Sequence, residues 1–124
     1  MKISLAIYAA PHTDGNAERA YHFARSALQL NHQIYRLFFF NEGVLNCADD
    51  TTYLCKQWQS LIEKHRLDAI ICSASAEKRG LTSAQNYSQD SATKPIHAAF
   101  QPGGIAQLID AAAHSERLLT FADT

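Results

Sequence analysis

The sequence predicts a single-domain α/β fold over residues 1–124, with a mostly parallel sheet covered by helices on both faces. Short apolar runs typical of buried strands alternate with longer segments whose apolar residues recur every three or four positions, as on one face of a helix. The connections are short, and no linker, internal repeat or second unit interrupts the pattern. Strands that alternate with helices in this way form parallel sheets with both faces covered.

The first half of the chain carries the clearest pattern. Pro11 and Gly15 mark a turn after the first apolar run, and Asn16 is the expected cap of the helix that follows. The elements expected here are strands over residues 3–9, 33–40 and 68–72, helices over 17–30 and 53–65, and a loop over 41–47. The buried stripe of the first helix is expected to contain Ala20, Phe23, Ala24, Ala27 and Leu28.

The pattern weakens after Gly80. Residues 81–94 are rich in Ser, Thr, Gln and Asn, which is typical of a loop or a poorly defined short helix. Further along we expect a strand over 95–100, a turn over 101–104, a helix over 105–114 and a closing strand over 117–121. The spacing that predicts the last helix runs through Ile105, Leu108, Ile109 and Ala112.

Composition excludes several classes of partner. The net charge of -1 argues against a nucleic-acid binder that works through a broad basic face, and the densest basic cluster is only Lys78 and Arg79. No apolar run approaches the length that spans a bilayer, and the apolar start of the chain is too short for a signal peptide. We therefore expect neither direct nucleic-acid binding nor a membrane partner.

The cysteine pattern points to reduced thiols. Three cysteines are an odd number without scaffold-like spacing, which favours free thiols and a cytoplasmic location. The paired spacings of metal sites, C-x-x-C and H-x-x-x-H, do not occur, and neither do the glycine motifs that cradle nucleotide phosphates. No metal and no other cofactor is expected.

Cys72 is the best single candidate for chemistry. It ends the short apolar run of residues 68–72, and the carboxyl ends of strands are where open α/β sheets place their ligands. The small residues Ser73, Ala74 and Ser75 let backbone N–H groups approach the sulfur, while Lys78 and Arg79 supply positive charge. A thiol reacts as thiolate, so an exposed sulfur in this setting is expected. The alternative is a buried cysteine that packs as a small hydrophobe.

Other candidate residues share the same edge of the expected sheet. The loop that carries Cys47 and the turn after the first strand are expected to form one rim with Cys72, whereas Cys55 is expected to pack inside its helix. Single histidines that could orient a substrate or act as a base are His12, His97 and His114. The glycines before the last helix fit a plain turn better than an anion cradle.

Several segments together resemble one family. They are Phe23-Ala24, Asn31-His32, the run from Phe38 to Asn46, the run from Gln57 to Leu61 and, above all, the run from Ile71 to Leu81, which ends in Arg79, Gly80 and a hydrophobic residue. Their order from the first strand to Leu81, and again from Gly103 to Phe121, resembles the DsrE/TusD-like sulfur-relay family. Cys47 and residues 81–94 lie outside the resemblance.

The resemblance implies a small DsrE-like α/β fold and a sulfurtransferase that accepts and passes on sulfur as a persulfide at a strand-end cysteine. That role falls on Cys72, with Ser73, Ala74 and Arg79 stabilising the persulfide anion. It also implies an upstream persulfide donor, a downstream sulfur-acceptor protein, and assembly with sister subunits in a heterohexamer or with itself. The implied end use is a tRNA 2-thiouridine relay.

Three alternatives stay open beside this interpretation. The first is a subunit of a sulfur-oxidation relay, since members of the same family serve in sulfur oxidation. The second is a non-catalytic structural subunit, because sister chains of such complexes share the fold without carrying sulfur. The third is a module that binds a small molecule on the same rim.

Overall fold

The structure, a computed structural model, describes residues 1–12, 15–89 and 92–123. Its centre is a five-stranded sheet in the order β6-β3-β2-β1-β7, in which every neighbouring pair of strands is parallel. These strands are β1 (Lys2–Ile7), β2 (Gln33–Phe39), β3 (Ala69–Cys72), β6 (Gln101–Gly103) and β7 (Arg117–Phe121). The predicted α/β class with a mostly parallel sheet is confirmed.

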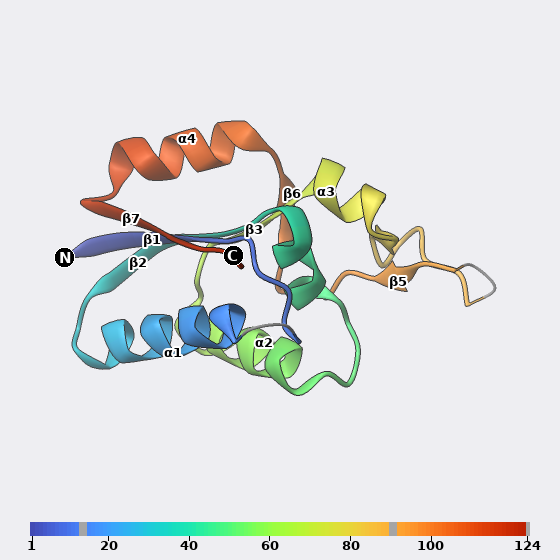
Figure 1. Ribbon diagram of the computed structural model, residues 1–124, viewed down its shortest axis with the longest axis horizontal. Coiled ribbons are helices and arrows are strands. Elements are labelled where there is room, and N and C mark those ends of the chain that lie inside the picture. The colour runs from blue at the N-terminus through green and yellow to red at the C-terminus, as the bar shows by residue number, and fades with distance from the viewer. Residues whose placement is uncertain (13–14, 90–91, 124) are drawn as a thin grey trace.

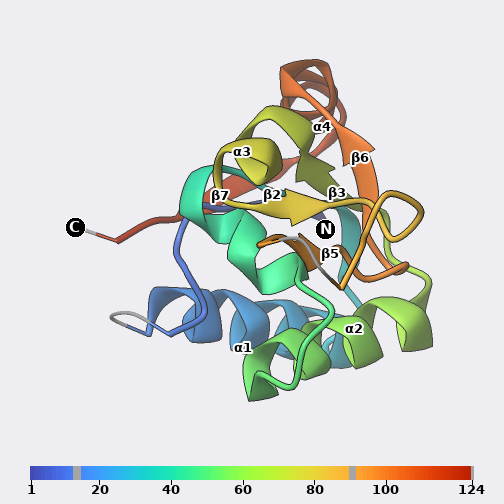
Figure 2. The same cartoon turned by 90° about the vertical axis from the view of Figure 1, so that its right-hand side faces the viewer.

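Helices cover both faces of this sheet. Helices α1 (Asn16–Gln29) and α2 (Tyr53–His65) lie on one face, and α4 (Ile105–His114) lies alone on the other (Figure 1). The 3-10 helix η1 (Asn41–Cys47) and helix α3 (Ser73–Lys78) gather beyond the carboxyl ends of the strands (Figure 2). There, β4 (Leu81–Thr82) and β5 (Lys94–Pro95) form a separate parallel pair.

The main core lies between the sheet and the α1–α2 layer. Trp58 of α2 is fully buried there, with edge-to-face contacts to Phe39 of β2 and Tyr21 of α1. Its indole N–H donates to the side-chain oxygen of Asn46 at 3.2 Å. Such aromatic packing with a satisfied polar tip accounts for much of the core stability of a small domain. Trp58 thereby joins α1 and α2 to β2, in the middle of the sheet.

The 3-10 helix is anchored at the end of β1 rather than running out as a loop. The Asn46 amide donates to the carbonyls of Ala9 and Gly43 at 2.9 and 2.8 Å. The backbone of Gly43 passes so close to Ile7 that a Cβ on it would lie 1.8 Å from the Ile7 carbonyl oxygen. The loop predicted over residues 41–47 is therefore a tightly packed helical turn.

Three further sequence predictions need correction. The prediction of a strand over 95–100 is wrong, because this part of the chain joins the five-stranded sheet only at Gln101–Gly103. The sequence predicts a turn there. Pro102 is tolerated there because β6 is an edge strand. The segment after Cys72 forms α3, which the sequence did not predict. Phe23 is about one-third exposed, beside Phe121, whereas Tyr21 is buried in its helix.

Candidate functional site

Cys72 lies at the carboxyl end of β3, as the sequence predicts. It is the last residue of that strand and also the N-cap of α3, so the strand passes into the helix without an intervening loop. On the side away from β2, Cys72 is paired in register with Gly103 of the edge strand β6. The thiol therefore stands at the end of an inner strand, where parallel sheets place their chemistry.

The expectation of an exposed sulfur at this position is wrong. Cys72 is only 5% exposed and belongs to the same apolar cluster as Ala76 and Leu81. Ala76 belongs to α3 and Leu81 to β4, so segments that follow Cys72 in the chain share in the packing around it. In this conformation Cys72 offers a reactant little surface.

The first turn of α3 follows the thiol directly. Ser73 and Ala74 are its first two residues, and no side chain caps the amides of this turn. The first amides of any helix lack partners inside the helix. Uncapped N–H groups thus lie next to Cys72 in the chain, where they are suited to donate hydrogen bonds to a negatively charged sulfur.

Arg79 folds back from the end of α3 toward the carboxyl end of β2. Its guanidinium donates to the side-chain oxygen of Asn41 at 2.7 Å and to the carbonyl of Ser75 at 3.4 Å. Asn41 in turn donates its backbone N–H to the Ser75 hydroxyl at 3.1 Å. These bonds tie α3 to the segment after β2, and Arg79 also lines a polar pocket of about 290 Å³ with Tyr8 and Asp123.

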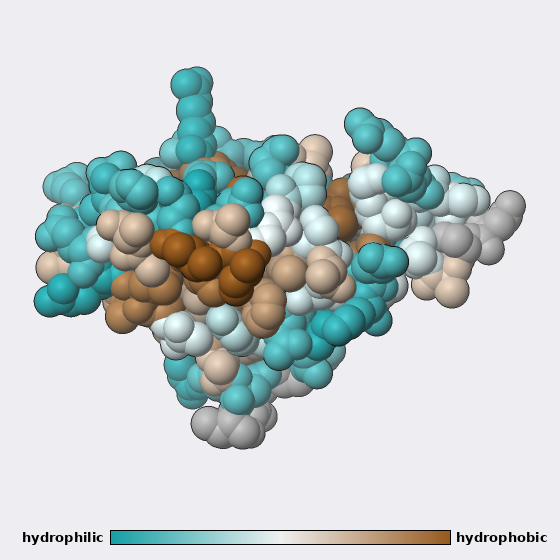
Figure 3. All heavy atoms as spheres, turned by 90° about the horizontal axis from the view of Figure 1, so that it is seen from above, coloured by the Kyte–Doolittle hydropathy of each residue, from teal (hydrophilic) through white to brown (hydrophobic). Residues whose placement is uncertain are grey.

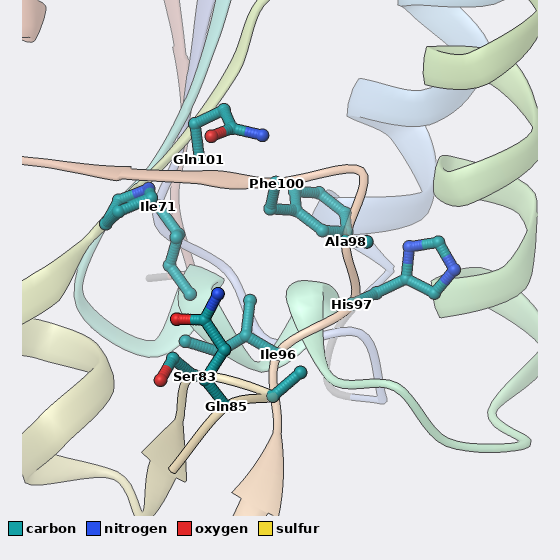
Figure 4. Close-up of a pocket in the computed structure, with 10 residues that line it drawn as sticks. Ile71, Ser83, Gln85, Ile96, His97, Ala98, Phe100 and Gln101 are labelled. Carbon is teal, nitrogen blue, oxygen red and sulfur yellow. The ribbon is translucent and has the colours of Figure 1, made fainter. Parts of the chain in front are cut away.

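An apolar groove runs along the other side of α3. Two adjoining pockets, of about 370 and 400 Å³, share four lining residues, namely Ile71, Ser83, Ile96 and Pro102. Figure 4 shows Ile71, Ile96 and Ser83 gathered around one of them, with the ring of His97 projecting away from Ile71. The second pocket reaches Ser73, the residue after the candidate thiol. The groove is thus lined by both chain neighbours of Cys72, Ile71 and Ser73.

The other two cysteines do not share this site. Cys47 ends η1 and is fully buried, and Cys55 lies on the inner side of α2, where its thiol donates to the Leu45 carbonyl. Burial raises the pKa of Cys47 well above its ordinary value, and the neighbouring Cys55 adds to this effect. Burial, helped by the charge of Asp50, raises the pKa of Cys55 to about 12. The packing role predicted for Cys55 is confirmed, and Cys47 lies inside the core instead of on a rim.

Cys47 and Cys55 are expected to resist alkylation in the native protein at neutral pH. A raised pKa leaves the thiol neutral, and only the thiolate reacts at a useful rate. Labelling with iodoacetamide followed by peptide mass spectrometry should find both unmodified until the pH approaches the pKa of about 12 of Cys55 or the protein is unfolded in urea. Modification of either residue at the rate of a free cysteine would contradict this assignment.

The predicted histidine candidates lie apart from Cys72. His114 is on the last turn of α4, beside Asp110, and its ring stacks on Tyr35. His97 accepts a hydrogen bond from the backbone of Ala99 at its Nδ1 and lines the apolar groove. His12 lies exposed in the turn after β1. Within the described ranges, no group of histidine, cysteine and acidic side chains could hold a metal ion.

Comparison with known proteins identifies the family. The sequence model of the DsrE/DsrF-like family matches residues 1–121 of this chain. The chain belongs to the DsrE/DsrF-like family. This confirms the resemblance inferred from the ordered segments of the sequence.

The family relatives match over nearly their whole length. The DsrE protein of Allochromatium vinosum is 35% identical over 99% of this chain and all of its own. A Pseudomonas aeruginosa protein named sulfurtransferase TusD homolog is 34% identical, covering 98% of this chain and 97% of its own. Sulfurtransferase TusD of Klebsiella pneumoniae is 33% identical over 98% of this chain and all of its own.

A solved structure shares the fold. The crystal structure of the YchN protein of E. coli matches with a TM-score of 0.75, covering 98% of this chain and 99% of that one. The sequence identity of 17% means that this likeness concerns the fold alone.

Sequence reasoning missed the groove and the anchor of Arg79. Ser83, Ile96 and several of their neighbours line the groove, and they lie after Gly80, where the sequence pattern weakens. Asn41 is bonded to Arg79 across 38 positions of the chain, and nothing local marks that pairing. The one local signal is the residue type of Asn41. Its backbone is left-handed after β2, and asparagine tolerates that conformation better than most residues.

Proposed function

We propose that the protein is a sulfurtransferase that carries sulfur as a persulfide on Cys72. The observation that carries this proposal is similarity over nearly the whole chain to relatives named sulfurtransferase. The position of Cys72 at the end of an inner strand, beside a groove, supports its choice over Cys47 and Cys55. The other two thiols are buried and held neutral by raised pKa values.

The proposed reaction is two successive exchanges at sulfur. The Cys72 thiolate attacks the terminal sulfur of a donor persulfide, R–S–SH, whose S–S bond breaks as the new Cys72 S–S bond forms. The donor leaves as the thiolate R–S⁻, and the proton stays on the transferred sulfur. An acceptor thiolate then attacks the same terminal sulfur and releases Cys72 as thiolate. No net oxidation occurs, so no metal, nucleotide or other cofactor is required.

Ser73, Ala74 and Arg79 are the proposed stabilising groups. The uncapped first turn of α3 supports a role for the Ser73 and Ala74 amides, which would donate hydrogen bonds to the persulfide anion. Arg79 would contribute its positive charge from the far end of the same helix, held by Asn41. Because Arg79 bonds Asn41, and Asn41 bonds Ser75, these bonds would also hold α3 in place after Cys72.

Donor and acceptor are proposed to be proteins that reach Cys72 from the groove. The groove is lined by Ile71 and Ser73, the two chain neighbours of Cys72, so a partner thiol seated there would lie near the Cys72 backbone. We propose a tRNA 2-thiouridine relay as the end use and an assembly of DsrE-like subunits, sister chains or copies of this one, as the working form. The three free cysteines fit a reducing compartment, the cytoplasm.

No membrane attachment belongs to this proposal. Across the residues that the structure places, none of the helices has the length and apolar character of a membrane span. We further propose that residues 1–124 act as one unit, since the family match spans residues 1–121.

Persulfide loading of the native protein tests the proposal. After incubation with a persulfide-loaded donor, sulfur labelled as ³⁵S should be found on the peptide that contains Cys72 and not on those of Cys47 or Cys55. Addition of excess acceptor thiol should remove it, because the exchange is reversible at sulfur. Label on a different cysteine, or none on any cysteine with an active donor and the assembled protein, would overturn the assignment.

The burial of Cys72 favours one alternative, a non-catalytic subunit of a DsrE-like oligomer. A thiol that is 5% exposed and packed in an apolar cluster is the arrangement expected of a structural cysteine. The two functions differ in how Cys72 responds to assembly. A carrier should gain alkylation and loading when its partners are present, whereas a structural subunit should keep Cys72 unreactive in both states.

A further inference from the structure

The order of the strands in the sheet reverses at β1. The chain runs from β1 through β2 and β3 to the edge strand β6, and it then returns to the other side of β1 as β7. Helices α1 and α2 lie on one face of the sheet, and α4, which leads into β7, lies on the opposite face (Figure 1). In open α/β sheets ligands bind beyond the carboxyl ends of the strands, at the point where the strand order reverses. The carboxyl ends of β1 and β7 are therefore the place where this fold is expected to hold a ligand.

The polar pocket of about 290 Å³ lies at this place. Its lining comes from four separate segments of the chain, namely Tyr8 after β1, Asn41 and Glu42 after β2, Arg79 after α3, and Ala122 and Asp123 after β7. The pocket shares no lining residue with the apolar groove on the other side of α3. A concave site where a few polar groups converge is the usual form of a small-molecule site.

Hydrogen bonds hold the walls of this pocket in place. The Tyr8 N–H donates to the Phe121 carbonyl at 2.8 Å, which joins the ends of β1 and β7. The Asn16 amide donates to the Ala122 carbonyl at 3.1 Å and to the Asp123 carboxylate at 3.3 Å. These bonds fix the segment after β7 against the start of α1. A site that is ordered before binding loses less conformational entropy when a ligand enters.

Polar character distinguishes this end of the sheet from the exposed face of α4. That face displays Ile105 and Ile109, which are 57% and 63% exposed, and hydrophobic residues gather on it (Figure 3). The pocket instead offers the Tyr8 hydroxyl, the Glu42 carboxylate and the Arg79 guanidinium. Groups of this kind recognise a ligand that is charged and forms hydrogen bonds.

Charges of both signs line the pocket without pairing with each other. Arg79 donates to neutral oxygens of Asn41 and Ser75, at 2.7 and 3.4 Å, and within the described ranges no ion pair joins it to Glu42. In the same part of the chain, no hydrogen bond or ion pair engages the Glu42 carboxylate or the Tyr8 hydroxyl. A ligand with an ammonium group beside a carboxylate would bridge the two charges. Its carboxylate would accept from Arg79, and its ammonium group would donate to Glu42.

We propose that this pocket binds a free α-amino acid in its zwitterionic form. The lining contains two carboxylates, Glu42 and Asp123, and one guanidinium, Arg79, and this balance disfavours a purely anionic ligand such as phosphate. A simple cation would leave Arg79 without a counter-charge, whereas an amino acid supplies an ammonium group and a carboxylate together. Binding there is separate from the proposed sulfur transfer, although Arg79 belongs to both sites.

An NMR titration with L-alanine as the probe tests the site. The backbone amide signals of Tyr8, Asn41 and Glu42 should shift and saturate as L-alanine is added. N-acetyl-L-alanine lacks the ammonium group and L-alaninamide lacks the carboxylate, so each loses one charge-assisted contact and should bind about tenfold more weakly. Saturable binding of either blocked compound at the affinity of L-alanine, or no saturable shift with L-alanine, would overturn the proposal.

Single substitutions tie this binding to the pocket. Glu42→Gln should weaken L-alanine binding about tenfold, and Tyr8→Phe should weaken it by a smaller factor, because it removes a neutral hydrogen-bonding group. Glu63→Gln is the matched control, since it removes an exposed carboxylate of α2 outside the pocket and should leave the dissociation constant unchanged. Wild-type affinity in Glu42→Gln would reject the site. Loading of Cys72 is measured on the same wild-type preparation, so alanine binding without loading rejects only the carrier, and loading without alanine binding rejects only the amino-acid site.

Discussion

Replacing Cys72 with alanine is expected to abolish sulfur acceptance. In the proposed exchange this sulfur is the attacking atom, and no other thiol of the chain can replace it, because Cys47 and Cys55 are buried and kept neutral. Acceptance should fall to the background seen without protein, a loss larger than that from any change to a stabilising group. Transfer of ³⁵S from a loaded donor, followed by gel separation without reductant, measures it directly.

The control for this experiment is the pair Cys47→Ala and Cys55→Ala. Both remove a thiol of similar size from a buried site, so both report the cost of a small cavity, of the order of 1 kcal/mol. Each should retain acceptance in the folded protein, with circular dichroism and urea unfolding showing that all three variants keep the fold. Acceptance by Cys72→Ala at the wild-type level would end the carrier hypothesis.

Gly43→Ala is expected to be the most destabilising single substitution of a small residue in the chain. The added methyl would lie 1.8 Å from the Ile7 carbonyl oxygen and 2.7 Å from its carbon, distances that no rotation can relieve. The oxygen cannot retreat cheaply, because it accepts the backbone N–H of Phe40 at 3.0 Å. A backbone shift of η1 would also strain the Asn46 bonds. We expect a loss of about 4 kcal/mol or more, the range of severe core disruptions.

Urea unfolding of Gly43→Ala beside Gly104→Ala measures this effect. Gly104 has open space around its Cβ position and an extended backbone, so alanine there meets no clash and should cost only about 1 kcal/mol, because alanine is a poorer N-cap for α4 than glycine. Similar midpoints for the two variants would mean that η1 is not held against β1 in the way described here. A Gly43→Ala chain too unstable to purify agrees with the expectation when Gly104→Ala purifies normally.

Elements with a long hydrophobic period could be predicted from the sequence. Helix α2 runs from Tyr53 to His65 and strand β7 from Arg117 to Phe121, both with the expected bounds. In α2 the helical period recurs over three turns, whereas β7 is a short β-rich run bounded by polar residues. Cys72 could be assigned to a strand end because the apolar run Ala69–Cys72 is followed directly by small polar residues.

Elements that depend on distant partners could not be predicted. Gln101–Gly103 contains proline and glycine and resembles a turn, and it becomes a strand only because β3 offers an unpaired edge. Helix α3 is six residues long, too short for a helical period to show. The bond from Arg79 to Asn41 depends on this helix, and the burial of Cys72 depends on tertiary packing, so neither could be predicted from the sequence.

The closed position of Cys72 determines how long a loaded sulfur would last. A persulfide in open solvent loses its terminal sulfur to any small thiol that collides with it. At the buried position of Cys72, such a collision would require a local opening first, so the leak would follow the opening rate and not the concentration of cellular reductant. A docked partner that causes this opening would remove the protection only at the moment of delivery. The same burial that hides the thiol would thereby distinguish productive transfer from wasteful reduction.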